Sequence, residues 1–489
     1  MKNRVLLALF VLFALTSCGT SKNVTQKTVT DREIVILAVN DIHANIDNFP
    51  RFAFMVDSLR AIYPDMLLVS GGDNQTGNPI NDQYQEKGRP TIELMNAVGF
   101  DLSAVGNHEF DHGAENFEKH TQIAKFDFLC ANMNLPKDMN FKVKPYKIVT
   151  MKNGLKVGFV SLLDLNPNNQ PACHPDHLTG FSFTDPYKTA PKYLYLKDSA
   201  DLLIFLNHLG FENDVKLANS LPEGTVDLII GGHSHTKVDK DQIHNGIMIT
   251  QADSKLKYAT LINLIVKPDG QVSRSMKLLT VDRKGNEQAA TRSMVDKYND
   301  NPVMKEVIAN APFEFRSKDE LGYWMADALK ATAKTQIAFI NKGGVRINHL
   351  AAGDISRKTI FTIDPFGNQV VTLNLTGHEI KAFITNMFGG QGYYKIMYPS
   401  GLHLKYTVSE DDSKLINLEF LNEDGTPFDM DKTYSVATNS YVIATADFQR
   451  KDPGKTLSIT TAEGCINWLM EEKTVKNYQN VKRVFVNNK

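Results

Sequence analysis

The chain has 489 residues, of which 42% are hydrophobic and 22% are charged, and its formal net charge is −1. This length predicts two or three domains with ordinary globular cores. The balanced charge excludes the global basic excess of many nucleic-acid-binding proteins, so no nucleic-acid partner is expected, and it excludes a strongly acidic disordered chain.

Residues 1–17 resemble a bacterial lipoprotein signal peptide. Lys2 and Arg4 make a positive start, and residues 5–15 form an unbroken apolar run that is too short to span a bilayer as a helix. Small residues then precede Cys18, as they do at lipidation sites. The resemblance implies a lipid anchor on Cys18, a polar tether over residues 18–32, and a place in the bacterial cell envelope, either periplasmic or facing the outer membrane. An ordinary secretory signal with an incidental cysteine is the alternative.

The first domain is predicted over residues 33–282, where five apolar runs share one pattern. Each run is followed by Asp, Asn or His, and the runs are residues 34–39, 66–70, 102–105, 202–206 and 226–230. Such continuous runs are typical of strands buried on both faces. Open α/β sheets bind ligands beyond the carboxyl ends of their strands. Five such strands in one sheet would therefore bring their polar residues to one site.

Further elements are predicted around these five runs. We expect helices at residues 49–62 and 91–98, between the early strands. Residues 246–252 and 259–264 alternate in polarity, which predicts further strands of a second sheet packed on the first.

The residues that follow the five runs suit a pair of metal ions. They comprise two carboxylates, one amide and four imidazoles, namely Asp41, His43, Asp73, Asn107, His208, His233 and His235. Without cysteine, this mixture suits Zn, Mn, Fe or Co. Seven ligands are too many for one tetrahedral ion, whereas two ions that share a carboxylate would use them all. Because paired ions clamp the oxygens of an in-line displacement, we expect phosphate-ester hydrolysis.

Besides Cys18, the chain has three cysteines, without a Cys-x-x-Cys pair that would indicate a zinc ribbon or a redox motif. Cys130 ends an apolar run and is predicted to lie in the core, and Cys465 stands alone. Cys173, His174 and His177 are close in sequence and could bind a metal ion. We interpret them as loop residues.

As an ordered set, the metal-ligand motifs resemble those of the calcineurin-like metallophosphatases, and residues 106–111 (GNHEFD) resemble the 5′-nucleotidase branch. The resemblance implies that Asp73 bridges two ions. One ion would be held by Asp41, His43, Asp73 and His235, and the other by Asp73, Asn107, His208 and His233. Bacterial nucleotidases often have Gln in place of His235, so the metal preference stays open.

The same resemblance implies that His108 and Asp111 form a catalytic dyad. Asp111 would hold the imidazole and favour its charged form. The imidazolium of His108 would then stabilise negative charge on the phosphoryl oxygens in the transition state. The implied nucleophile is a metal-bound water.

The chain turns polar after residue 282, and we place a linker over residues 283–312 with a helix-forming stretch at residues 290–298. A second domain is predicted over residues 313–489. Its expected elements are helices at residues 322–333 and 377–388, a strand at residues 336–340, and a hairpin turn at residues 422–427.

The second domain resembles the substrate-binding domain of the 5′-nucleotidases through residues 341–346 (NKGGVR), 364–368 (DPFGN) and 436–441 (VATNSY). The resemblance implies that Phe366 and Tyr441 sandwich a nucleobase. It also implies that Asn341 and Asp447 hydrogen-bond the base or ribose, and that Arg346 binds phosphate or a carboxylate. Arg316 is a further candidate anion contact. The chain departs from the family pattern at Lys342, at residues 322–323 and at residues 445–448.

Together these predictions describe an α/β protein with an N-terminal four-layer αββα metallophosphoesterase domain and a smaller α/β C-terminal domain. The expected activity is hydrolysis of nucleoside 5′-monophosphates, with UDP-sugars and 2′,3′-cyclic nucleotides as further candidate substrates. One alternative is a sulfur–sulfate hydrolase with the same two-domain plan. A second alternative is a non-catalytic nucleotide-binding lipoprotein. The sequence does not set the oligomeric state.

Overall fold

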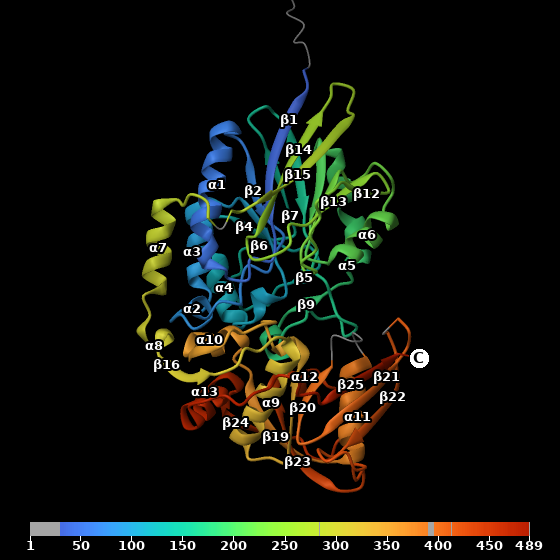
Figure 1. Cartoon of the computed structure of the whole chain (residues 1–489). Helices are drawn as coiled ribbons and strands as arrows, with labels where there is room; N and C mark the ends of the chain where they lie inside the picture. Colours follow the sequence, from blue (N-terminus) through green and yellow to red (C-terminus); the bar gives the residue numbers. More distant parts are fainter. Residues whose placement is uncertain (1–29, 283, 390–395, 412, 489) are drawn as a thin grey trace, which may run out of the picture.

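The computed structural model describes residues 30–282, 284–389, 396–411 and 413–488. The predicted signal peptide, Cys18 and most of the predicted tether lie outside these residues. The chain folds into two α/β domains, with the first above the second in Figure 1. Among the described residues, none of the helices has both the length and the apolar character that a membrane crossing requires.

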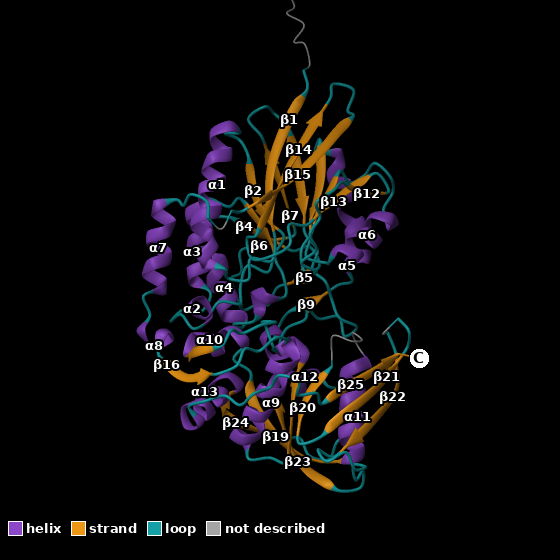
Figure 2. Ribbon diagram, viewed as in Figure 1, coloured by secondary structure: helices purple, strands orange, loops and turns teal. Residues whose placement is uncertain are grey.

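The first domain contains two mixed sheets (Figure 2). The seven-stranded sheet has the order β15-β14-β1-β2-β3-β4-β6, with these strands at Val272–Thr280, Tyr258–Val266, Arg32–Val39, Leu67–Ser70, Leu102–Ala104, Asp127–Leu129 and Val143–Lys144. The six-stranded sheet has the order β12-β13-β11-β10-β8-β7, with these strands at Gln242–His244, Ile247–Thr250, Leu228–Ile230, Leu202–Leu206, Lys156–Val160 and Tyr146–Thr150. A short pair, β5 (Met133–Asn134) and β9 (Ser182–Phe183), lies apart from both.

Alternating side chains explain why the central strands are apolar throughout. Ile36 of β1 packs between the two sheets, in one cluster with Phe159 and Ile204 of the second sheet. Its neighbour Leu37 points to the opposite face and packs with Phe52 under the outer helices. The outer helices of the first sheet are α1 (Phe49–Ile62), α3 (Arg89–Val98), α4 (Ala114–Ile123) and α7 (Ala289–Asn299). Helix α6 (Phe211–Ser220) covers the second sheet, so the predicted four-layer αββα arrangement is confirmed.

The prediction that all five apolar runs lie in one sheet is wrong. Strands β1, β2 and β3 belong to the first sheet, whereas β10 and β11 belong to the second. Strand β13 does lie in the second sheet, but β14 pairs antiparallel with β1, for example Ile36 with Ile262. A continuous apolar run indicates a strand that is buried on both faces. Strands of either sheet in a two-sheet sandwich are buried in this way, so the run does not show which strands pair with it.

Residues of the predicted linker are folded. Helix α7 contacts α1 and α3, and the short helix α8 (Pro302–Lys305) contacts α10 (Arg357–Ile363). Strand β16 (Val307–Ala311) pairs with β18 (Gly353–Ser356). The segment therefore packs on both domains, and the limits of the two domains stay predictions.

The second domain is built on a five-stranded sheet of order β20-β17-β23-β19-β24 and a three-stranded sheet of order β22-β21-β25. The strands of the first are Met397–Ser400, Ile337–Asn341, Thr433–Asn439, Gln369–Thr376 and Lys455–Thr460, and those of the second are Leu415–Leu421, His403–Val408 and Val484–Asn488. The longer helices are α9 (Lys318–Ala333), α11 (Gly377–Gly389) and α13 (Thr461–Glu472). At the junction in Figure 1, α10 contacts α2 (Pro79–Asp82), and α12 (Ser440–Thr445) contacts the 3-10 turn at Pro175–Leu178.

Two local predictions in this domain have different outcomes. Helix α9 begins four residues before the predicted start because the Ser317 hydroxyl accepts the backbone N–H of Glu320, which caps the helix. The turn at residues 422–427 exists, since the backbone N–H of Asn422 donates to the carbonyl of Thr426 at 2.9 Å. An antiparallel bridge between Leu421 and Pro427 closes this turn. The long strands on its two sides, β22 and β23, lie in different sheets, so the predicted hairpin does not extend beyond the turn.

Candidate active site

The predicted metal ligands converge where the carboxyl ends of the two sheets meet. Those that follow strands of the first sheet are Asp41, His43, Asp73 and Asn107, and those that follow strands of the second are His208, His233 and His235. Two groups have their donor atoms within 4.8 Å of one another, namely Asp41 with His43 and His235, and Asp73 with His208 and His233. Asn107 joins the second group, because its Oδ1 lies 3.0 Å from Nδ1 of His233.

Asp73 lies between the two groups. Its Oδ2 is 3.0 Å from Nε2 of His208. Asp73 also shares a further group of close donor atoms with His43 and His108. The carboxylate therefore occupies the position that a bridging ligand would need.

The ring nitrogens of His43 and His235 are placed so that a cation could bind between them. Nδ1 of His43 lies 3.0 Å from the carbonyl oxygen of Thr76. Because a carbonyl only accepts, Nδ1 carries the proton and the neutral ring presents a lone pair at Nε2. Burial lowers the pKa of His43 well below its usual value, which keeps the ring neutral. Its Nε2 lies 2.9 Å from Nε2 of His235, a pairing that a shared metal ion would stabilise.

In the second ligand group, a backbone carbonyl likewise fixes the orientation of the His208 ring. Its Nδ1 lies 2.7 Å from the carbonyl oxygen of Gly71, so its Nε2 faces Asp73. Burial lowers the pKa of His208, but Asp73 outweighs burial and raises it to about 10. A proton and a metal ion therefore compete for the same nitrogen. The donor set fits divalent metal ions, with backbone carbonyls fixing the ring orientation.

Several ligand residues have backbone angles that side chains other than glycine rarely adopt. The φ angles are 50° at Asp41, 47° at His43, 51° at Asp73, 79° at His233 and 54° at His235. Such strain costs about 1–3 kcal/mol per residue and concentrates at functional sites. The turns hold these side chains in place at the expense of stability.

Gly106 shows how tightly the ligand loops pack. A Cβ atom added there would lie 2.2 Å from Oδ1 of Asp73. The missing side chain leaves room for the carboxylate, which accepts the backbone N–H of His108 at 2.8 Å.

His108 and Asp111 form a close pair in the first turn after the third strand. Nδ1 of His108 lies 2.5 Å from Oδ2 of Asp111. Burial lowers the pKa of His108, but the charges of Asp111 and Asp73 outweigh burial, and the pKa is raised. Nε2 of His108 lies 3.9 Å from Oδ2 of Asp73. The imidazolium therefore faces the candidate metal centre.

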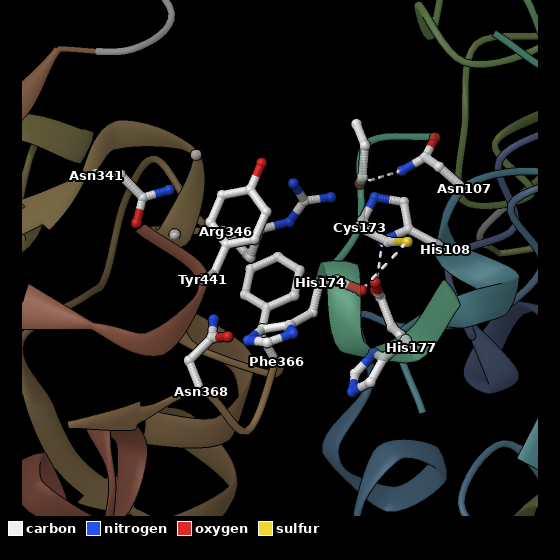
Figure 3. A pocket seen from close by; sticks show the side chains of 14 residues that line it. Asn107, His108, Cys173, His174, His177, Asn341, Arg346, Phe366, Asn368 and Tyr441 are labelled. Atoms are coloured by element: carbon white, nitrogen blue, oxygen red, sulfur yellow. Dashed lines mark hydrogen bonds and ion pairs between the residues drawn. The ribbon is translucent and has the colours of Figure 1, made fainter. Parts of the chain in front are cut away.

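One cavity of about 220 Å³ lies next to this pair and has walls from both domains (Figure 3). The first domain contributes Asn107, His108, Asp111, Cys173, His174 and His177, and the second contributes Asn341, Arg346, Phe366, Asn368 and Tyr441. The rings of His108 and Phe366 stack across the cavity, with centroids 6.2 Å apart. The guanidinium carbon of Arg346 lies 5.4 Å from the centroid of Phe366.

The structure does not bring all predicted substrate residues to this cavity. Arg316 lies outside its lining and pairs with Glu314 at 3.2 Å. Asp447 is exposed and outside the lining, so its contact with base or ribose stays a prediction. The neighbouring Phe448 packs on Phe383 of α11, with ring centroids 5.2 Å apart.

Two acids near the site, the buried Glu109 and the half-buried Asp164, were not assigned a role from the sequence. Glu109 accepts the backbone N–H groups of Asp73 at 3.1 Å, Asn74 at 2.8 Å and Gly106 at 2.6 Å, and burial together with Asp73 raises its pKa to about 7. Asp164 lies 3.7 Å from Nε2 of His233, and burial raises its pKa to about 6. Asp164 follows a sixth, largely apolar run at residues 157–163, which begins in β8, so the pattern of the other five runs could have revealed it.

The remaining cysteine and histidine predictions are settled by position. Cys130 and Cys465 are buried, as expected for Cys130. Cys173, His174 and His177 do not form a metal-ligand group among the described residues. Cys173 and His174 lie in a loop, as interpreted from the sequence, whereas His177 lies in the 3-10 turn at Pro175–Leu178, and all three line the cavity. Asn368 also lines it, a role that the motif at residues 364–368 could have indicated.

Two family sequence models match the chain. Calcineurin-like phosphoesterase matches residues 34–237, and the C-terminal domain of 5′-nucleotidase matches residues 305–449. Together they cover more than two thirds of the chain. The chain belongs to the two-domain 5′-nucleotidase family. It is therefore a phosphate-ester hydrolase whose first domain binds divalent metal ions.

Similar proteins agree with this family over nearly full length. A 5′-nucleotidase of Vibrio cholerae is 26% identical, with 96% of this chain and 94% of the relative covered. The protein UshA of Escherichia coli is also 26% identical, with 89% of each chain covered.

Solved structures share the fold. A 5′-nucleotidase precursor from Thermus thermophilus has a TM-score of 0.82 at 24% identity, and covers 94% of this chain and 100% of its own. The sulfate thiohydrolase SoxB of the same genus has a TM-score of 0.74 at 14% identity, and covers 93% of this chain and 96% of its own. At these identities the likeness concerns the fold alone.

Proposed function

We propose that this chain hydrolyses nucleoside 5′-monophosphates to a nucleoside and phosphate, using two divalent metal ions. The observation that carries the proposal is the cavity in which His108 of the metallophosphoesterase domain faces Phe366 of the substrate-binding domain. A phosphate-cleaving group and an aromatic platform thus share one space. The name of the Vibrio cholerae relative, 5′-nucleotidase, supports this choice of substrate.

The ligand groups suggest how two ions would be held. One would take Asp41, His43, Asp73 and His235, and the other would take Asp73, Asn107, His208 and His233. Nitrogen and oxygen donors without thiolate suit Zn, Mn, Fe or Co. When bound, such ions polarise the phosphoryl group and activate water for attack.

The protein residues around the centre have separate tasks in the proposal. Asp111 holds the His108 imidazole through Nδ1 and favours its charged form, so that His108 stabilises negative charge on the phosphoryl oxygens. Arg346, whose guanidinium lies near Phe366, provides a second positive charge for the phosphate. Phe366 and Tyr441 would hold the two faces of the base, each stacked base contributing about 1–3 kcal/mol.

We also propose that the protein is anchored to a membrane of the bacterial cell envelope through a lipid on Cys18. The support is the sequence alone: a positive start, a short apolar run, and small residues before the cysteine. A lipid chain would keep the catalytic domains near the membrane surface.

The proposal is tested by comparing two substrates with the same kind of ester. We expect kcat/KM for a nucleoside 5′-monophosphate to exceed that for ribose 5-phosphate by about ten- to a hundredfold, because only the nucleotide has a base to stack. Equal values would show that the second domain does not recognise the base. Sulfate release from a sulfur–sulfate substrate, without phosphate release from nucleotides, would favour the alternative activity.

A further inference from the structure

The imidazole of His233 presents a different nitrogen to the candidate metal centre from those of His43 and His208. In His43 and His208, Nδ1 lies beside a backbone carbonyl and Nε2 faces the ligand groups. In His233, Nδ1 itself lies 3.0 Å from Oδ1 of Asn107, which belongs to the same ligand group. An ion held by these two atoms needs a lone pair on Nδ1. The proton of the neutral ring must then be on Nε2.

Nε2 of His233 faces the carboxylate of Asp164. The distance from Nε2 to Oδ2 is 3.7 Å, which is within ion-pair range and longer than a hydrogen bond. Both side chains are partly exposed, so a small rotation can close this gap. A carboxylate in this position favours the ring form with the proton on Nε2 and makes Nδ1 a stronger donor to a metal ion.

Backbone and side-chain contacts hold Asp164 in place. Its backbone N–H donates to the carbonyl of His208 at 2.9 Å, which ties it to the carboxyl end of β10. Its Oδ1 accepts from Nδ2 of Asn213, in the first turn of α6, at 3.2 Å. Oδ1 of Asn213 in turn accepts from the hydroxyl of Tyr187 at 3.1 Å. Because Asn213 engages Oδ1 of the carboxylate, Oδ2 is left to face the imidazole.

Asp164 acts through His233 rather than as a ligand itself. It belongs to none of the groups of close donor atoms that the described residues form. Its place beside a ligand is the one that an outer carboxylate takes at many metal sites, where it orients the histidine and strengthens metal binding.

We propose that Asp164, held by Asn213, is a positioning residue for His233 that raises the affinity of the second ligand group for its metal ion. The inference rests on the proposed function, because it takes the proposed division of the seven ligands between two ions. It adds an eighth residue to the metal centre, one that orients a ligand without binding the ion.

The test measures the stepwise binding of Mn²⁺ to the metal-free full-length protein by isothermal titration calorimetry, in the wild type and in Asp164→Asn. The amide keeps the size of the side chain and loses its charge. We expect one ion to bind about 10–100-fold more weakly in the variant, the usual cost of losing such a partner, and the other to bind as in the wild type. Asp164→Glu, which keeps the charge, should restore part of the loss. The matched control is Asp198→Asn, at an exposed acid before β10 in the same domain, and it should change neither affinity.

Thermal unfolding of the metal-free proteins distinguishes positioning from a folding defect. We expect the metal-free form of Asp164→Asn to have the Tm of the metal-free wild type. A lower Tm together with weaker binding of both ions would show that the substitution acts on folding, and would overturn the inference. Unchanged binding of both ions would overturn it as well.

A double-mutant cycle tests the part that Asn213 plays. We expect Asn213→Ala to weaken the same ion less than Asp164→Asn does, and the double variant to lose no more than Asp164→Asn alone, since Asn213 acts through Asp164. Additive losses would overturn this arrangement. These titrations contain no substrate. If the binding results were as expected and no nucleotide were hydrolysed, the proposed function would fail and the inference would stand.

Discussion

The imidazole of His108 and the phenyl ring of Phe366 stack across the domain boundary, with planes 23° from parallel. His108 belongs to the domain that holds the metal ligands, and Phe366 belongs to the domain that would bind the base. This contact brings the two halves of a nucleotide site within reach of one substrate molecule. Nucleotide hydrolysis at this site would therefore need both domains, and the contribution of each domain can be tested separately.

Replacing His108 tests charge stabilisation without disturbing the ligand groups. We expect His108→Asn to lower turnover by about 10²–10⁴-fold, because the imidazolium no longer faces the phosphoryl oxygens. Metal content, measured by elemental analysis, should stay at the wild-type value. If the variant loses metal, His108 is itself a ligand, and the division between ligands and dyad is wrong.

Replacing Asp73 tests the bridge between the two ligand groups. Asp73→Ala should remove both ions together, since the carboxylate lies beside donors of each group. Asp111→Asn is a suitable control for metal content, because Asp111 contacts His108 rather than a ligand. Retention of about two ions per chain with normal turnover in Asp73→Ala would contradict the bridging role.

The positions of the metal ligands could be predicted from the sequence because each follows a buried strand. A continuous apolar run identifies a strand that is buried on both faces, and the end of the run fixes where the polar residue emerges. The sheet to which β10 and β11 belong could not be predicted this way, since pairing is a tertiary choice. The exposed position of Asp447 could not be predicted either, because it depends on how the neighbouring Phe448 packs on Phe383.

Asp364, two residues before Phe366, gives a prediction about the dependence of stability on pH. Burial raises its pKa to about 6, and the hydroxyl of Thr461 donates to its carboxylate. An unfolded Asp has a pKa near 3.9, so the native state binds this proton more tightly. The group therefore lowers stability as pH rises from about 4 to about 6, by up to about 3 kcal/mol.

Asp364→Asn should remove this contribution, because the amide stays neutral and its oxygen can still accept from Thr461. The measurement is the free energy of unfolding by denaturant at pH 4.5 and pH 7.5. We expect the variant to gain stability relative to wild type at the higher pH. A difference that is independent of pH would show that Asp364 does not titrate as stated.

The proposed anchor can be tested by one substitution. Cys18→Ser should abolish lipidation and release the protein from membranes, because the apolar run at residues 5–15 is too short to remain as a span. Detergent partitioning of the expressed protein checks this. A variant that still partitions into detergent would contradict the lipid anchor.

The most direct measurement for the whole account is the effect of Phe366→Ala on two substrates. For a nucleoside 5′-monophosphate we expect KM to rise by about ten- to a hundredfold, since a lost stacking contact costs about 1–3 kcal/mol. For p-nitrophenyl phosphate, which has no nucleobase, the rise in KM should be much smaller. Phe313→Ala, at a phenyl ring that is 47% exposed, is the control for folding. Equal effects on both substrates, or none on either, would contradict base recognition by the second domain and with it the nucleotidase function.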